Sequence, residues 1–176
     1  GRHLTLHAAA VLLVLVVGRP VMTEGGLFHA DEAAVLMQAR ALDRTGSWEL
    51  RNPEPVIDPE MNHVPPQPAS RTDDGWFPYI KHPAYVALVY AASWAAGDTA
   101  AVLVSMLGTA VAALFAGLLA ERLRAGAGAV GVWVTGIGTP LFFDAYVVQA
   151  HTIGAAFAGG AAVAAVNAVS GPRPHH

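Results

Sequence analysis

Charge and cysteine are what this 176-residue sequence has least of. Charged residues make up 13% of the chain and hydrophobic residues 54%, whereas an ordinary soluble domain carries roughly 25% charged residues. This balance disfavours a small water-soluble globule. The absence of cysteine excludes disulfides, thiolate metal sites and cysteine nucleophiles. A formal net charge of −3 provides no basic surface of the kind that binds nucleic acid, so no nucleic-acid partner is predicted.

Three common catalytic motifs are also missing, namely a P-loop, H-E-x-x-H and G-x-S-x-G. One G-x-G-x-x-G match runs from Gly126 to Gly131. It follows Arg122 and Arg124 rather than a strand, which is the wrong context for a dinucleotide site. Small residues that pack membrane helices together are the better interpretation.

The charges that are present are segregated along the chain. Ten of the 13 acidic residues lie between Glu24 and Asp74, and long charge-free runs occupy most of the rest. Because the hydrocarbon core of a bilayer needs about 20 apolar residues in a helix, the sequence predicts an all-α integral membrane protein with about four transmembrane helices. The predicted spans cover residues 4–22, 99–120, 125–141 and 150–168.

The first of these runs has a second interpretation, a cleaved signal peptide. No small-x-small cleavage site follows Gly18, where the chain continues Arg19-Pro20-Val21. A retained span is therefore favoured, with the Arg19 side chain reaching to the membrane interface.

Orientation depends on residues 83–97, a charge-free run of only 15 residues. If this run crossed the membrane, Arg122 and Arg124 would lie outside. If it lies at the outer surface instead, both arginines become cytoplasmic, which is where Lys and Arg usually collect. The second arrangement is preferred. It makes residues 1–176 a single membrane module with both termini inside and a large first outer loop over 23–98.

The outer loop is predicted to hold two juxtamembrane helices. Apolar spacing favours a helix over 31–45, with Asp31 where an N-cap belongs. Six prolines between residues 52 and 68 indicate extended, irregular chain. The second helix is predicted over 83–97.

The same loop brings carboxylates and cations to one membrane surface. Asp31 and Glu32 open the first juxtamembrane helix, and Lys81 and His82 precede the second. A base that faces a cationic anchor suits group transfer from a phosphate-linked substrate. The simpler interpretations are a cap and dipole partner for the helix and an interface anchor for the lysine.

Two further polar residues, Gln149 and His151, lie near the outer end of the last predicted span. A polar residue at membrane depth is a functional candidate, although a neutral histidine can also pair with a neighbouring helix. The spacing of His29, His63 and His82 matches no metal motif, so no metal site is predicted.

Six short sequence elements occur at particular positions before, between and after the predicted spans. They are Asp31-Glu32-Ala33-Ala34, Lys81-His82-Pro83-Ala84-Tyr85, Trp94-Ala95-Ala96-Gly97, Glu121-Arg122-Leu123-Arg124, Thr139-Pro140-Leu141-Phe142-Phe143 and Gln149-Ala150-His151-Thr152. This order resembles the N-terminal part of GT-C superfamily membrane glycosyltransferases, in the branch of protein O-mannosyltransferases and aminoarabinose transferases. The resemblance covers nearly all of this chain and less than half of a typical family member.

Two departures from the family pattern leave the completeness of the module open. Ala84 stands where the family has the second proline of its Lys-Pro-Pro or His-Pro-Pro element, and the chain stops after four predicted spans. The sequence therefore resembles a truncated GT-C-like N-terminal module. A fragment, one piece of a split enzyme completed by a second chain, and a degenerate remnant all fit this pattern.

The resemblance implies transfer of a sugar from a polyprenyl-phosphate donor to an acceptor hydroxyl of a glycan, lipid or protein. The reaction would take place at the extracytoplasmic face of the cell membrane, with no metal or other cofactor. The catalytic residues would be Asp31, as general base, and Glu32, and the substrate-binding residues would be Lys81, His82, Gln149 and His151. The alternative is a non-catalytic multi-pass membrane protein: an inactive remnant, a partner subunit or part of a transporter.

Overall fold

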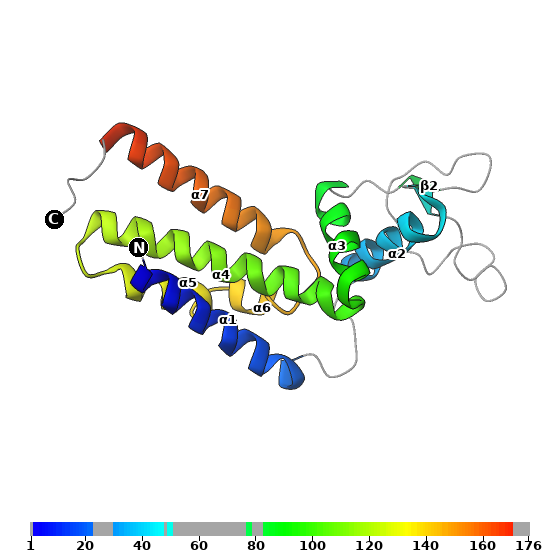
Figure 1. The fold of residues 1–176 in the computed structure, drawn as a ribbon, viewed down its shortest axis with the longest axis horizontal. Coiled ribbons are helices and arrows are strands. Elements are labelled where there is room, and N and C mark those ends of the chain that lie inside the picture. The colour runs from blue at the N-terminus through cyan, green and yellow to red at the C-terminus, as the bar shows by residue number, and fades with distance from the viewer. Residues whose placement is uncertain (1, 23–29, 48, 51–76, 79–82, 171–176) are drawn as a thin grey trace. The chain divides into compact units, whose positions relative to one another are not determined.

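The computed structural model describes residues 2–22, 30–47, 49–50, 77–78 and 83–170. The described elements are helices apart from one short antiparallel strand pair, β1 (Glu49–Leu50) with β2 (Phe77–Pro78). The helices are α1 (Arg2–Met22), α2 (Ala30–Thr45), α3 (Pro83–Ala96), α4 (Asp98–Leu123), α5 (Gly128–Ile137), α6 (Leu141–Asp144) and α7 (His151–Ser170) (Figure 1). The predicted helical fold is confirmed for this part of the chain.

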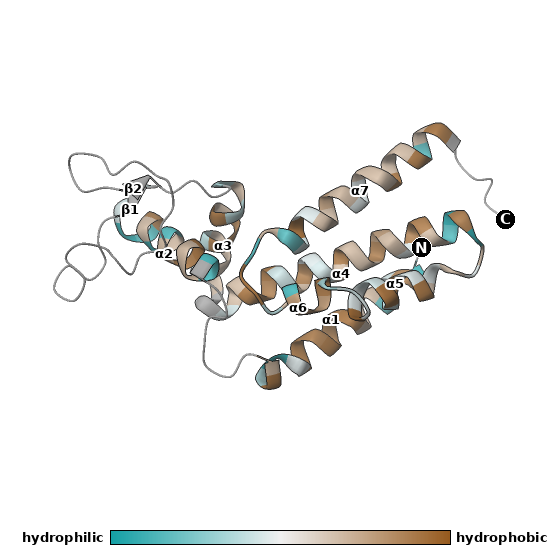
Figure 2. Ribbon diagram, turned by 180° about the vertical axis from the view of Figure 1, so that it is seen from behind, coloured by the Kyte–Doolittle hydropathy of each residue, from teal (hydrophilic) through white to brown (hydrophobic). Residues whose placement is uncertain are grey.

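Three helices are long and apolar enough to cross a membrane. They are α1 over Arg2–Met22, α4 over Thr99–Leu123 and α7 over His151–Val169. A helix of about 20 residues extends about 30 Å, which matches the hydrocarbon thickness of a bilayer. Figure 2 shows apolar residues along α1 and a mixture of hydrophilic and apolar residues on α2. The three long helices indicate a membrane protein.

The fourth predicted span, over residues 125–141, is not confirmed. The structure has the 10-residue helix α5 there, which extends about 15 Å, half the thickness of the hydrocarbon core. Gly126 adopts a positive φ of 83° before α5, and Gly138 and Pro140 interrupt the helix after it. Because proline lacks the N–H that a continuing helix needs, the chain starts a separate short helix, α6, at Leu141.

The chain divides into two compact units. The first contains the described parts of 1–24, 105–146 and 150–176, and the second contains the described parts of 25–104 and 147–149. The boundary between the two units falls within α4, and the prediction of a single membrane module stays a prediction. The membrane-span candidates α1 and α7 lie in the first unit, and the helices α2 and α3 lie in the second.

In the first unit, α4 lies between α7 and the pair formed by α1 and α5 (Figures 1 and 2). Val11 and Leu15 on α1 are completely buried. A Cβ atom on Gly131 of α5 would come within 2.8 Å of the Ala120 Cβ and 3.1 Å of the Ala116 carbonyl oxygen on α4. The two backbones approach so closely that only glycine fits at this crossing, which is the usual way small residues pack membrane helices.

The turn between α4 and α5 is closed by the Glu121 carboxylate. Its oxygens accept hydrogen bonds from the backbone N–H groups of Gly126, at 3.0 and 3.1 Å, and of Gly128, at 2.9 Å. Free N–H groups at a helix N-terminus attract anions. Because Glu121 already occupies this position, the G-x-G-x-x-G stretch has its own carboxylate in place of a phosphate.

The segment between α6 and α7 carries a buried tyrosine of the first unit. Tyr146 packs edge-to-face on Phe142, with ring centroids 5.5 Å apart, and is only 3% exposed. Its hydroxyl has no hydrogen-bond partner among the described residues. Burial raises the pKa of Tyr146 above its usual value of 10.0, because the charged phenolate is disfavoured away from water.

In the second unit, α2 packs against α3. The buried side chains at the contact come from both helices: Ala34, Val35, Leu36 and Ala39 on α2, and Tyr85, Val86 and Val89 on α3. Each helix ends at a glycine with positive φ, Gly46 at 66° and Gly97 at 65°. The Gly97 N–H bonds to the Ser93 carbonyl oxygen at 2.7 Å, and this left-handed cap turns the chain from α3 into α4.

Candidate functional site

The acidic pair predicted from the sequence lies in the first turn of α2. The helix begins at Ala30, so Asp31 and Glu32 complement the positive end of the helix dipole. Asp31 is partly exposed, whereas Glu32 is buried, with only 2% of its surface exposed. The two neighbouring carboxylates therefore have different surroundings and can have different roles.

Glu32 holds a distant segment of the second unit. Its Oε1 accepts a hydrogen bond from the backbone N–H of Val148 at 2.8 Å. Val148 is itself only 1% exposed, so this N–H depends on a protein acceptor rather than on water. The bond joins residues 116 positions apart, and it brings the start of α2 to the segment that leads into α7.

The same segment carries Gln149, another of the predicted site residues. Gln149 is partly exposed, and its backbone N–H bonds to the Val147 carbonyl oxygen at 2.9 Å. The Val148 N–H donates to Glu32, and Gln149 directly follows Val148 in the chain. The backbone of Gln149 therefore lies near the start of α2. The structure thus links Glu32 to the residue before Gln149, and a shared site for Asp31, Glu32 and Gln149 stays a prediction.

His151 belongs to the first unit, where it pairs with Asp144. Its Nδ1 lies 3.5 Å from the Asp144 carboxylate, and the side chain is 64% exposed. An exposed pair of this kind contributes little to stability, typically about 0–1 kcal/mol. The contact gives Asp144, which is itself partly exposed, this histidine as a neighbour.

Lys81 and His82 lie outside the described residues. The expectation that they face Asp31 across one cavity stays a prediction. His29 and His63 also lie outside the described part of the chain. Among the residues that the structure does describe, no group of three or more His, Asp or Glu side chains could hold a metal ion.

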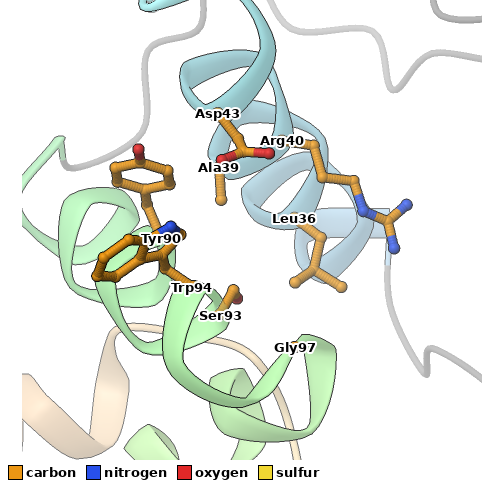
Figure 3. Close-up of a pocket in the computed structure, with 8 residues that line it drawn as sticks. All are labelled: Leu36, Ala39, Arg40, Asp43, Tyr90, Ser93, Trp94 and Gly97. Carbon is orange, nitrogen blue, oxygen red and sulfur yellow. The ribbon is translucent and has the colours of Figure 1, made fainter.

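A pocket of about 270 Å³ lies between α2 and α3 in the second unit (Figure 3). From α2 it is lined by Leu36, Ala39, Arg40 and Asp43, and from α3 by Tyr90, Ser93 and Trp94, with Gly97 after the helix. Asp31 and Asp43 are 12 positions apart, about 18 Å along the helix. The pocket therefore extends from the middle of α2 towards its C-terminal end and does not include the acidic pair.

Sequence reasoning missed this pocket. A signal was present, because Leu36, Arg40 and Asp43 follow helical spacing on α2, and Tyr90 and Trp94 are one turn apart on α3. Only the packing of the two helices turns these spacings into one concave surface.

The described part of the chain is mainly helical, and three of its helices are long and apolar enough to span a bilayer, which indicates a helical membrane protein. No family model, curated protein or solved structure matches the chain significantly.

Proposed function

We propose that this chain is a module of a membrane glycosyltransferase that transfers a sugar from a polyprenyl-phosphate donor to an acceptor hydroxyl. The proposal follows the GT-C-like order of short elements in the sequence. The observation that carries it further is the hydrogen bond from the Val148 N–H to Glu32. This contact joins the acidic pair to Val148, the residue before Gln149, and all of these residues belong to the second unit.

The proposed chemistry assigns different roles to the two acids. Asp31 takes the proton from the acceptor hydroxyl, and the oxygen of that hydroxyl attacks the anomeric carbon of the donor sugar. The bond between this carbon and the phosphate oxygen breaks, and polyprenyl phosphate leaves with the electron pair. Lys81 and His82 stabilise the charge that develops on the leaving phosphate. Gln149 and His151 contact the sugar or the phosphate.

Glu32 is a positioning residue in this scheme. Its carboxylate accepts the Val148 N–H, and its surface is almost entirely covered. The Glu32 carboxylate, which accepts this backbone N–H, holds the segment around Val148 next to the base. Asp31 is more accessible and takes the proton from the acceptor hydroxyl. The second candidate function, a non-catalytic membrane protein, is favoured by the same observation, because a buried and bonded Glu32 also serves a purely structural purpose.

The deciding experiment measures sugar transfer in liposomes that contain a polyprenyl-phosphate-linked sugar and a hydroxyl acceptor. We expect Asp31→Asn to abolish transfer while the protein stays folded, because the amide cannot accept the proton. Glu32→Gln, which keeps an acceptor for Val148, should retain part of the activity. Arg44→Gln, which changes an exposed charge near the other end of α2, serves as the control.

Two results would count against the proposal. Full activity of the Asp31→Asn protein would remove Asp31 as the base. Failure of the wild-type protein to transfer sugar from any polyprenyl-phosphate donor would favour the non-catalytic alternative.

A further inference from the structure

The pocket between α2 and α3 lies at the boundary of a membrane span. Gly97 lines the pocket, and the membrane-span candidate in α4 begins at Thr99, two residues later. The first residues of α4, up to Val104, belong to the same compact unit as the pocket. The Gly97 side of the pocket therefore lies close in the chain to the start of a membrane-span candidate.

The α3 side of the pocket is aromatic. Tyr90 and Trp94 are four residues apart, so both rings lie on the same side of α3. Trp94 is 83% exposed, and tryptophan and tyrosine are enriched at membrane interfaces. An exposed indole face attracts cations through its quadrupole, and aromatic cages recognise quaternary ammonium groups in this way.

The α2 side of the pocket adds a carboxylate. Asp43 is exposed and forms no ion pair or hydrogen bond with the other described residues. Figure 3 shows Asp43 on α2 beside Ala39, and it shows the Arg40 guanidinium directed away from Tyr90 and Trp94. The lining thus includes two aromatic rings and one carboxylate, together with the Arg40 side chain, whose guanidinium points away from the rings. The rings and the carboxylate favour a positively charged group on their side of the pocket.

Size and polarity also limit the ligand. A volume of about 270 Å³ lies just below the range of pockets for drug-sized molecules, so it suits a head group rather than a whole lipid. The Ser93 hydroxyl lies buried at this pocket and has no hydrogen-bond partner among the described residues. A ligand with one polar group beside its cation would satisfy that hydroxyl.

We propose that the pocket between α2 and α3 binds the ammonium group of a zwitterionic phospholipid. The ammonium lies against Tyr90 and Trp94 and pairs with the Asp43 carboxylate, while the acyl chains stay in the adjoining bilayer. Anionic lipids are disfavoured, because the same carboxylate repels a head group that carries only negative charge. The pocket binds such a lipid whether or not the chain transfers a sugar.

The test counts lipids bound to the intact chain by native mass spectrometry in a non-ionic detergent. Dihexanoyl phosphatidylethanolamine, dihexanoyl phosphatidylcholine and dihexanoyl phosphatidylglycerol are titrated separately. We expect one saturable site for the two ammonium lipids and none for phosphatidylglycerol. Asp43→Asn and Trp94→Leu should each weaken binding about tenfold, which corresponds to about 1.4 kcal/mol.

Two matched controls separate the pocket from general lipid adhesion. Arg44→Gln changes an exposed charge next to Asp43, and Phe157→Leu removes an exposed aromatic side chain from α7 in the other unit. Both proteins should bind as the wild type does. Since Asp43 is exposed and unpaired, Asp43→Asn should fold normally, and an unchanged lipid affinity in this variant would overturn the proposal.

Two further results would also overturn it. One is binding of phosphatidylglycerol as tight as that of phosphatidylethanolamine. The other is full displacement of the lipid by tetramethylammonium at an equal concentration, which would assign the pocket to a soluble ammonium compound instead.

Discussion

Replacing Glu32 by alanine tests the contact on which the candidate site depends. In the structure, Glu32 Oε1 accepts the Val148 N–H at 2.8 Å, and both residues are almost completely buried. Alanine removes the acceptor, and water cannot easily replace it at a buried N–H. The variant therefore loses the connection between the start of α2 and the segment before α7.

The expected cost follows from the burial. An unsatisfied buried donor costs about 1–3 kcal/mol, so we expect Glu32→Ala to lower the free energy of unfolding by about 2 kcal/mol. For a chain of this length, 1 kcal/mol shifts the melting temperature by about 2–4 °C, which predicts a decrease of about 4–8 °C. Glu32→Gln retains an amide oxygen as acceptor, and its decrease should be less than half as large.

Thermal unfolding of the purified chain in detergent, at one fixed scan rate, measures this change. Amide hydrogen exchange at Val148 gives the local readout, since loss of about 2 kcal/mol should speed its exchange about thirtyfold. Asp43→Ala is the control, because it removes an exposed acid from the same helix. The reasoning is refuted if Glu32→Ala melts within 1 °C of the wild type and Val148 exchanges at its original rate.

Three other expectations concern the first unit. Glu121→Gln should lower the melting temperature by about 2–4 °C, because a neutral amide replaces the carboxylate that accepts the Gly126 and Gly128 N–H groups; an unchanged melting curve would contradict this. Gly131→Leu should cost at least about 1–3 kcal/mol by forcing α5 away from α4, measured as loss of monodisperse protein on gel filtration, and a normal elution profile would argue against the close crossing. Tyr146→Phe should leave the free energy of unfolding nearly unchanged at pH 7. At high pH it should remove part of the decrease in stability that the wild-type protein shows. Because burial raises the Tyr146 pKa above 10.0, its contribution is present below pH 10 and is lost as the pH rises through the folded-state pKa; parallel pH profiles for the two proteins would exclude this assignment.

Much of the helical organisation could be predicted because it depends on local properties. Apolar spacing and charge-free length act over one or two dozen residues, so the sequence predicts helices over 31–45 and 83–97, where the structure has Ala30–Thr45 and Pro83–Ala96. The long apolar runs behind α1, α4 and α7 have the same origin.

The run over 125–141 shows where composition misleads. Its residues are apolar enough for a membrane span, and hydropathy averages over all of them. The helix ends, in contrast, depend on the backbone at single residues. The positive φ at Gly126 and the missing N–H of Pro140 limit the helix to Gly128–Ile137. The glycine and proline were visible in the sequence and could have indicated the short helix.

The sequence by itself determined the acidic pair, the position of Gln149 and the apolar segments, because each is a property of neighbouring residues. Only the tertiary structure decided that Glu32 accepts the N–H of Val148 and that Asp43 shares a pocket with Trp94. These contacts join positions far apart in the chain, and they depend on how α2 packs against α3 and on where the chain returns before α7. Since side chains of very different spacing can meet in a packed fold, local patterns cannot specify such pairs. Only the packed structure shows that Asp31 is partly exposed while Glu32 is buried.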